Sequence, residues 1–212
     1  MDDVLTAREL ARRQLEEQLP TRWRHVQAVA AEAARLSVGL RLAAWPLVAA
    51  AWLHDIGYVP DVAATGFHPL DGARFLRASG WPVDITGLVA HHTCALVEAD
   101  ARGLGGALRA EFVRRDDLVQ DALWRADATT GPGGERLTLE ERVTEVEVRY
   151  GRGSCVATSM LKVQPFLAQA IERTEFARDG RLTAAPSVPS RRGLPNSTDR
   201  RLGLPKEGVI QA

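Results

Sequence analysis

Residues 49–60 read AAAWLHDIGYVP, an apolar run that ends on a histidine, an aspartate and a glycine. Pro46 suits the first turn of a helix and Gly57 suits its end, so the pattern predicts a core helix between these two residues. An imidazole and a carboxylate are costly to bury without partners. The adjacent His54 and Asp55 therefore require a reason for lying at the end of a core helix.

Helical periodicity extends to both sides of this segment, and no run alternates with a period of two. We therefore expect no sheet and an all-α fold. Three further helices are predicted over residues 4–18, 68–80 and 114–128. Two more begin at cap residues: one starts after Thr21, and one covers residues 85–101 after Asp84. Another runs from the capping box at residues 138–141 to residue 151, and the last covers residues 154–177 with a break or kink at Pro165.

The character of the sequence changes near residue 179. Residues 1–178 carry the helical patterns and predict a single helical domain. Residues 179–212 are rich in proline, glycine and arginine and poor in apolar periodicity. Such a composition predicts a disordered C-terminal tail.

The overall composition is that of a globular protein without a strong electrostatic field. Lysine plus arginine and aspartate plus glutamate each number 27, so we expect neither a nucleic-acid polymer nor a membrane as partner. No apolar run has the length of a spanning helix, and the first 20 residues do not resemble a signal peptide. The two cysteines, Cys94 and Cys155, form no disulfide framework. The expected compartment is the cytoplasm.

All the histidines of the chain lie in or beside apolar helical segments in its first half. They are His25, His54, His68, His91 and His92. Imidazole together with carboxylate suits a divalent first-row metal such as manganese, iron, cobalt, nickel or zinc. Asp127 is a further candidate ligand, because it lies in register with apolar residues of its helix.

Each candidate also has a simpler interpretation. His25 alone would be a hydrogen-bonded core histidine, and Asp127 alone a helix cap or an ion-pair partner. His68 precedes a proline and could be a loop residue. One of His91 and His92 could be merely exposed, since neighbours on a helix diverge by about 100°. The joint pattern makes the metal site the better hypothesis.

The pattern resembles that of the HD-domain superfamily of metal-dependent phosphohydrolases, whose signature is H…HD…D. The first histidine matches His25 in RWRHVQAVA, the dyad matches His54 and Asp55 in WLHDIGY, and the last aspartate matches Asp127 in LWRADATTG. The resemblance implies a helical bundle in which these four residues bind one metal within residues 20–130. It implies catalytic roles for His54 and Asp55.

Some members of the superfamily bind two metals through the longer pattern H…HD…H…HH…D. The middle residues of this longer pattern, H and HH, match His68 and the pair His91-His92 of this chain. By resemblance, Asp55 bridges the two ions and the extra histidines hold the second ion. The expected cofactor is therefore one or two divalent ions.

Two departures from relatives concern the residues after the dyad. Many members have a lysine three residues after the dyad aspartate, where this chain has Tyr58. A cationic contact to phosphate is therefore missing there. The GYP motif of cyclic-dinucleotide phosphodiesterases is also absent, because residues 57–60 read GYVP. That activity is not expected.

A divalent ion lowers the pKa of its bound water and polarises a phosphoryl oxygen. The resemblance thus implies hydrolysis of a phosphomonoester or phosphodiester in a small phosphorylated molecule, such as a nucleotide. Arg22, Arg24 and Arg149 are candidates for contacts to the anionic substrate, and Thr129 and Thr130 for the pocket rim.

Two other functions remain open. The six-ligand set is also similar to that of HD-fold mixed-valent di-iron oxygenases, although Tyr58 counts against them as well. A non-catalytic nucleotide-binding regulatory module is the third hypothesis. The intact set of ligands argues against it, because a module without catalysis has no need of four metal ligands.

Overall fold

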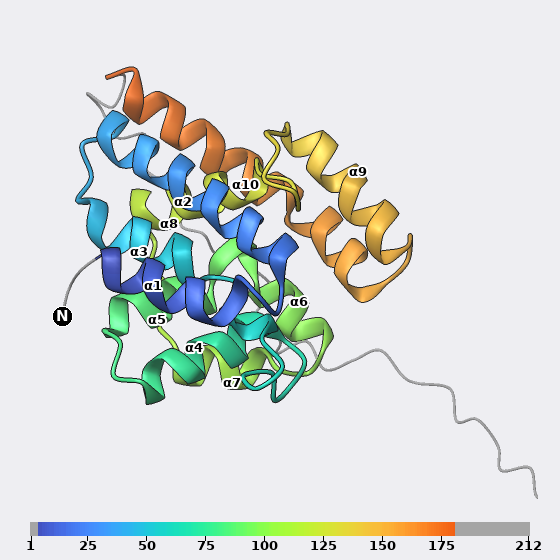
Figure 1. Cartoon of the computed structure of the whole chain (residues 1–212). Helices are drawn as coiled ribbons and strands as arrows, with labels where there is room; N and C mark the ends of the chain where they lie inside the picture. The colour runs from blue at the N-terminus through green and yellow to red at the C-terminus, as the bar shows by residue number, and fades with distance from the viewer. Residues whose placement is uncertain (1–3, 181–212) are drawn as a thin grey trace, which may run out of the picture. The chain divides into compact units, whose positions relative to one another are not determined.

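The structure is a computed structural model that describes residues 4–180 (Figure 1). Within that range it contains ten α-helices, two 3₁₀ turns and no strand, which confirms the predicted all-α fold. The α-helices are α1 (Val4–Leu15), α2 (Pro20–Gly39), α3 (Ala44–Leu53), α4 (His68–Ala78), α5 (Val83–Ala90), α6 (Leu96–Ala101), α7 (Gly105–Glu111), α8 (Leu118–Ala128), α9 (Leu139–Tyr150) and α10 (Cys155–Arg178). The 3₁₀ turns are η1 (Ile56–Tyr58) and η2 (His92–Cys94).

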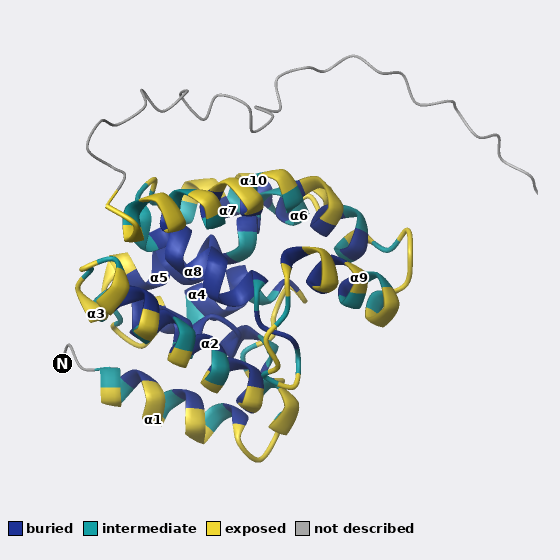
Figure 2. Cartoon of the chain, turned by 90° about the horizontal axis from the view of Figure 1, so that it is seen from above, coloured by how far each residue is buried: buried dark blue, intermediate teal, exposed yellow. Residues whose placement is uncertain are grey.

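Helix α3 lies at the centre of the bundle and packs against α1, α2, α5 and α8. Its alanines, Ala49 to Ala51, are fully buried and let neighbouring helices approach closely. Helix α8 is also buried on almost every side (Figure 2). Burial of apolar surface is the main favourable term in folding, so these two helices form a well-supported base for the dyad and for Asp127.

The predicted role of Gly57 as the end of a helix is wrong. Helix α3 ends at Leu53, and Gly57 lies inside η1. A Cβ atom at Gly57 would lie 2.1 Å from the carbonyl oxygen of His68 and 2.7 Å from the backbone nitrogen of Gly72. The glycine is required because the backbone of η1 lies directly against α4, and this contact brings His68 beside the dyad.

The predicted single helix over residues 85–101 is also wrong. Helix α5 ends at Ala90, and α6 starts at Leu96 after η2. Thr93 and Cys94 have φ angles of 47° and 55°, in the left-handed region that non-glycine residues rarely adopt. Tertiary contacts of η2 with α8 and α10 accompany this break, and local helical periodicity does not report them.

The helix caps give a mixed outcome. The capping box of Thr138 and Glu141 is confirmed. Helix α2 starts at Pro20, one residue before the predicted cap Thr21, because proline suits the first helical position. Helix α5 starts at Val83, so Asp84 lies in the first turn and is not the cap.

Helices α8 and α10 also differ from the prediction. Helix α8 starts after Asp117, whose carboxylate accepts hydrogen bonds from two backbone N–H groups. Helix α10 continues through Pro165 as one helix, so the predicted break is absent. Its buried residues, such as Val163 and Leu167, pack in a second apolar cluster that includes residues of α8 and α9, and this burial offsets the lost backbone hydrogen bond.

The predicted boundary between domain and tail falls at the end of the described range. Helix α10 ends at Arg178 and a turn follows it. Residues 181–212, which make up nearly all of the predicted tail, lie outside the described residues. None of the helices in residues 4–180 combines the length and apolar character needed to cross a membrane.

Candidate metal centre

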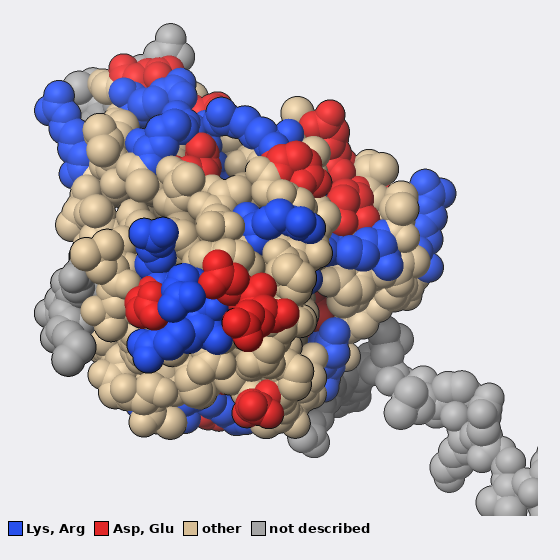
Figure 3. Space-filling view, in the orientation of Figure 1, with Lys and Arg blue, Asp and Glu red and all other residues tan. Residues whose placement is uncertain are grey.

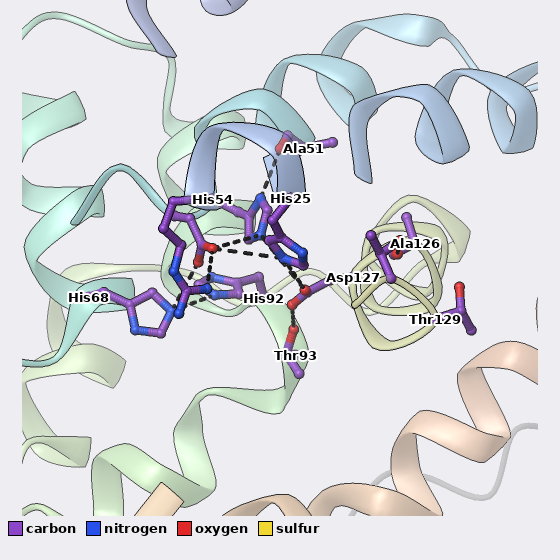
Figure 4. Close-up of polar contacts among 12 residues, drawn as sticks. His25, Ala51, His54, His68, His92, Thr93, Ala126, Asp127 and Thr129 are labelled. Carbon is purple, nitrogen blue, oxygen red and sulfur yellow. Dashed lines mark hydrogen bonds and ion pairs between the residues drawn. The ribbon is translucent and has the colours of Figure 1, made fainter. Parts of the chain in front are cut away.

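The structure brings together all the predicted ligands except His91. They form two groups, and within each group one potential ligand atom per residue lies within 4.8 Å of the others. The first ligand group is His25, His54 and Asp127, and the second ligand group is Asp55, His68 and His92. Figure 4 shows that the labelled side chains of both groups point toward one another from different helices.

The first ligand group connects α2, the end of α3 and α8. His25 Nε2 lies 3.1 Å from Asp127 Oδ1 and 3.4 Å from His54 Nε2. His54 Nε2 lies 3.8 Å from the same Asp127 oxygen. All three residues are buried, so their polar atoms depend on one another or on a bound ion.

The second ligand group lies beside the first. His68 Nε2 lies 3.0 Å from His92 Nε2 and 3.4 Å from Asp55 Oδ1. The other oxygen, Asp55 Oδ2, faces the first group, at 3.6 Å from His54 Nε2 and 3.8 Å from His25 Nε2. Asp55 thus directs one oxygen to each group, which is the orientation of a bridging carboxylate.

The backbone orients three of the four imidazoles in these groups through Nδ1. A carbonyl oxygen only accepts hydrogen bonds, so each Nδ1 carries a proton, and in the neutral ring the lone pair lies on Nε2. The pairs are His25 with Gly131 (2.9 Å), His54 with Ala51 (2.8 Å) and His92 with Val89 (2.6 Å). Such second contacts fix the tautomer of metal-binding histidines. His25 Nε2 and His54 Nε2 face each other, and a shared cation would satisfy the lone pairs of both.

Thr93 is a site residue that the sequence did not single out. Its hydroxyl donates a hydrogen bond to Asp127 Oδ2 (Figure 4). This contact leaves Asp127 Oδ1 directed at the histidines of the first group. The left-handed backbone of Thr93 places the hydroxyl there. A threonine next to a histidine pair is too common a pattern to reveal this role.

The protonation states suit ligation. Burial lowers the pKa of His54 and lowers that of His68 well below the ordinary value, so both imidazoles are neutral near pH 7. Burial raises the pKa of Asp55, but the charges around it, which include the Arg22 guanidinium, more than reverse this effect, and the pKa lies well below its usual range. Arg22 Nη1 lies 2.8 Å from Asp55 Oδ2. The site therefore holds an ionised Asp55 beside the neutral imidazoles of His54 and His68.

Asp127 is held ionised in a similar way. Burial raises its pKa, and the contact with His25 Nε2 together with nearby charges, which include Arg142, lowers it well below the ordinary value. Ionised aspartates and neutral histidines are the forms that bind divalent ions. The donor set of both groups thus fits a first-row divalent metal, with no thiolate among its ligand atoms.

The expectation that His91 is a ligand is corrected by its placement. Its Nε2 lies 2.9 Å from the carbonyl oxygen of Phe112, away from both ligand groups. Its own carbonyl oxygen accepts a hydrogen bond from Trp124 Nε1 at 2.7 Å. The backbone turns between α5 and η2, so the two adjacent histidines point in different directions. His91 anchors this turn and His92 joins the site.

A cavity of about 290 Å³ opens onto the ligands. Its wall includes every residue of the second ligand group and, from the first, His25 and Asp127. Helices α9 and α10 also contribute to the wall of this cavity, with both apolar and polar side chains. The apolar residues contributed there are Val146, Val156, Met160 and Val163. The cavity arginines are Arg22, Arg102, Arg142 and Arg149.

Tyr58 lies in a stack at the edge of the second ligand group. Its ring packs on the His68 ring, with 4.0 Å between centroids and 18° between planes. The Arg22 guanidinium lies over the same tyrosine ring, 4.0 Å from its centroid, and also donates to the hydroxyl of Tyr150. Tyr58 occupies the position where many relatives have a lysine, and Arg22 supplies a positive charge beside it. The tyrosine ring orients both His68 and Arg22.

The remaining candidates from the sequence have different placements. Arg149 is part of the cavity wall. Arg24 donates to the hydroxyl of Thr21 on an exposed surface. Thr129 and Thr130 donate to backbone carbonyls of α8 and do not line the cavity.

Comparison with known proteins gave one match. Residues 22–146 match the family model described as HD domain. This span begins at Arg22, contains both ligand groups and ends within α9. No curated protein and no solved structure matched the chain.

Proposed function

The chain belongs to the HD-domain family, and from this premise we propose that it is a metal-dependent phosphohydrolase for a small phosphorylated molecule. The bond cleaved is a phosphomonoester or phosphodiester, as in a nucleotide. The observation that carries the proposal is the orientation of Asp55, which directs one oxygen to each ligand group. The two groups would hold one ion each, from the series manganese, iron, cobalt, nickel and zinc.

Bound divalent ions supply a water of lowered pKa and polarise a phosphoryl oxygen. The residues of the chain have three tasks around that chemistry. His54 and Asp55 hold the reacting centre at the end of the buried helix α3. Arg22 offsets negative charge beside Asp55, at 2.8 Å. The cavity walls limit the size of the substrate and position it. Positioning raises the rate of reaction, because it holds the reacting atoms in the right geometry.

The cavity and surface charges support a small molecule as substrate. The cavity wall combines four arginines with apolar side chains of α9 and α10, which suits an organic phosphate. On the face seen in Figure 3, basic and acidic side chains are interspersed. Recognition of a nucleic-acid polymer requires a basic patch or stripe, and this face has none.

The direct test is hydrolysis by protein loaded with manganese, cobalt, nickel or iron. Aryl phosphates and a panel of nucleotides are the substrates, and released phosphate is measured. His54→Ala should abolish turnover, since it removes a buried ligand. Asp121→Asn is the matched control, because Asp121 is equally buried on α8 but pairs with Arg173. Full activity of the His54 variant would refute the proposal.

The bridging orientation of Asp55 also fits a second function, that of an HD-fold mixed-valent di-iron oxygenase. Iron content, an EPR signal of the mixed-valent state and substrate-dependent oxygen uptake would identify it. Phosphate release without oxygen uptake identifies the hydrolase. A nucleotide-binding regulatory module would show ligand binding in calorimetry without turnover of any substrate.

A further inference from the structure

Arg142 of α9 is a buried cation with an unused donor. Its exposed fraction is 8%, and it is part of the wall of the cavity that contains the metal ligands. Its Nη1 donates to Glu145, one turn further along α9. Its Nε–H is buried and has no acceptor. Buried polar groups nearly always have a hydrogen-bond partner, so this N–H requires an explanation.

The inner face of α9 presents a short stripe to the cavity. Arg142, Val146 and Tyr150 lie at intervals of four residues, and all three line the cavity. The Tyr150 hydroxyl lies 3.3 Å from Arg22 Nη2. The other terminal nitrogen of Arg22, Nη1, donates to Asp55 of the dyad. The charge of Arg142 is among those that lower the pKa of Asp127, so Arg142 lies within electrostatic reach of the first ligand group.

The local ion pairs do not neutralise Arg142. The carboxylate of Glu145 also accepts a contact from Arg149, whose Nε lies 3.0 Å from Oε1. One carboxylate thus serves two guanidinium groups, and one positive charge is left over at this wall. By contrast, Arg102 has its own partner in Glu98 at 2.7 Å. Among residues 4–180, the Nε of Arg142 is the one guanidinium nitrogen buried without an acceptor.

We propose that Arg142 binds a non-bridging oxygen of the substrate's phosphoryl group through its guanidinium. The inference rests on the proposed function, because it assumes that the tetrahedral oxyanion lies between the ligand groups and α9. Arginine suits this task, since its rigid fork and permanent charge match phosphate geometry. Glu145 positions the guanidinium, and the apolar residues beside it leave the anion with few competing water molecules.

The test is the affinity of the metal-loaded protein for inorganic phosphate, measured by isothermal titration calorimetry. Metal content and thermal stability are measured for every variant. Arg142→Met should weaken phosphate binding at least tenfold, because a charge-assisted hydrogen bond is lost. Arg142→Lys should give an intermediate loss, since it keeps the charge without the fork. Arg125→Met is the matched control: Arg125 is also 8% exposed but pairs with Thr174 outside this cavity, and its variant should bind phosphate within twofold of the wild type.

The outcomes separate this inference from the function. Phosphate affinity that is unchanged in Arg142→Met, or no phosphate binding by the wild type, overturns the inference even if esters are hydrolysed. Phosphate binding that depends on Arg142, in a protein that hydrolyses no ester, supports the anion contact and refutes the hydrolase. If Arg142→Met does not fold, Arg142→Lys decides the question, and wild-type phosphate affinity in that variant overturns the inference.

Discussion

The two ligand groups differ in how they meet the cavity. In the first, His25 and His54 are 1% and 0% exposed, and His54 is not part of the cavity wall. In the second, all three residues line the cavity and the side chain of His68 is 18% exposed. Under the proposed function, the first group would hold its ion as a fixed part of the core, whereas the second would hold its ion at the cavity that receives the substrate. Asp55 couples the two.

The largest expected effect is that of Asp55→Asn, which would break both groups together. The amide cannot offer a charged oxygen to each ion, so activity should fall roughly 10³-fold or more, given that a metal contributes several kcal/mol and each 1.36 kcal/mol is a factor of ten. Metal content and turnover of an aryl phosphate are the measurements. A variant that keeps two ions per chain and wild-type turnover would contradict the bridging role.

Variants at His68 and His25 would test the difference directly. His68→Ala should lose one ion and keep the other, with turnover reduced roughly 10²-fold, as expected when one contributor to the metal environment is lost. His25→Ala should also lower the melting temperature, because it empties a buried position and removes the contact to Gly131. Elemental analysis and thermal unfolding are the measurements. Equal effects of the two variants on stability and metal content would remove the proposed difference.

The adjacent His91 and His92 form a natural pair of variants. His92→Asn should lower metal content and turnover, because His92 belongs to the second ligand group. His91→Asn should keep both and cost about 1 kcal/mol in the free energy of unfolding, through the lost hydrogen bond to Phe112. Urea unfolding and metal analysis give the two readings. Loss of metal in the His91 variant would show that His91 acts on the site.

The last expected effect is the pH dependence of the metal-free protein. Burial lowers the pKa of His54 below its ordinary value of 6.5, so between these two pKa values the unfolded chain binds more protons. The free energy of unfolding should therefore fall as the pH drops below about 6.5, by at most about 1.4 kcal/mol per pH unit for this group. Urea unfolding between about pH 5 and 8 measures the slope. His54→Gln should have a shallower slope, and an identical slope would exclude this cause.

Much of the site could be predicted because its signals are local. The dyad ends an apolar run, and His25 and Asp127 lie in register with apolar residues of their helices. A histidine or aspartate at a position that periodicity predicts to be buried is unusual, and this can be recognised from the sequence. The resemblance to the HD domain then joined these positions, and the match over residues 22–146 confirmed the family.

Other features depend on contacts between distant segments. His92 joins the site and His91 does not, because the chain turns at His91, between α5 and η2. The residue after His92, Thr93, carries the hydrogen bond to Asp127. The need for glycine at position 57 follows from its contact with α4. Arg142 looks in the sequence like one more surface arginine of a charged helix. Only its burial and its missing acceptor distinguish it.

By itself the sequence determined that the chain is helical, that it belongs to the HD-domain family, and which residue types offer ligands for a divalent ion. Periodicity and residue chemistry are properties of short segments and can be read along the chain. The tertiary structure decided that Asp55 faces both ligand groups, that His91 faces neither, and that α9 adds Arg142 to the cavity. These outcomes depend on where separate helices pack, and packing arises from contacts that no single segment contains.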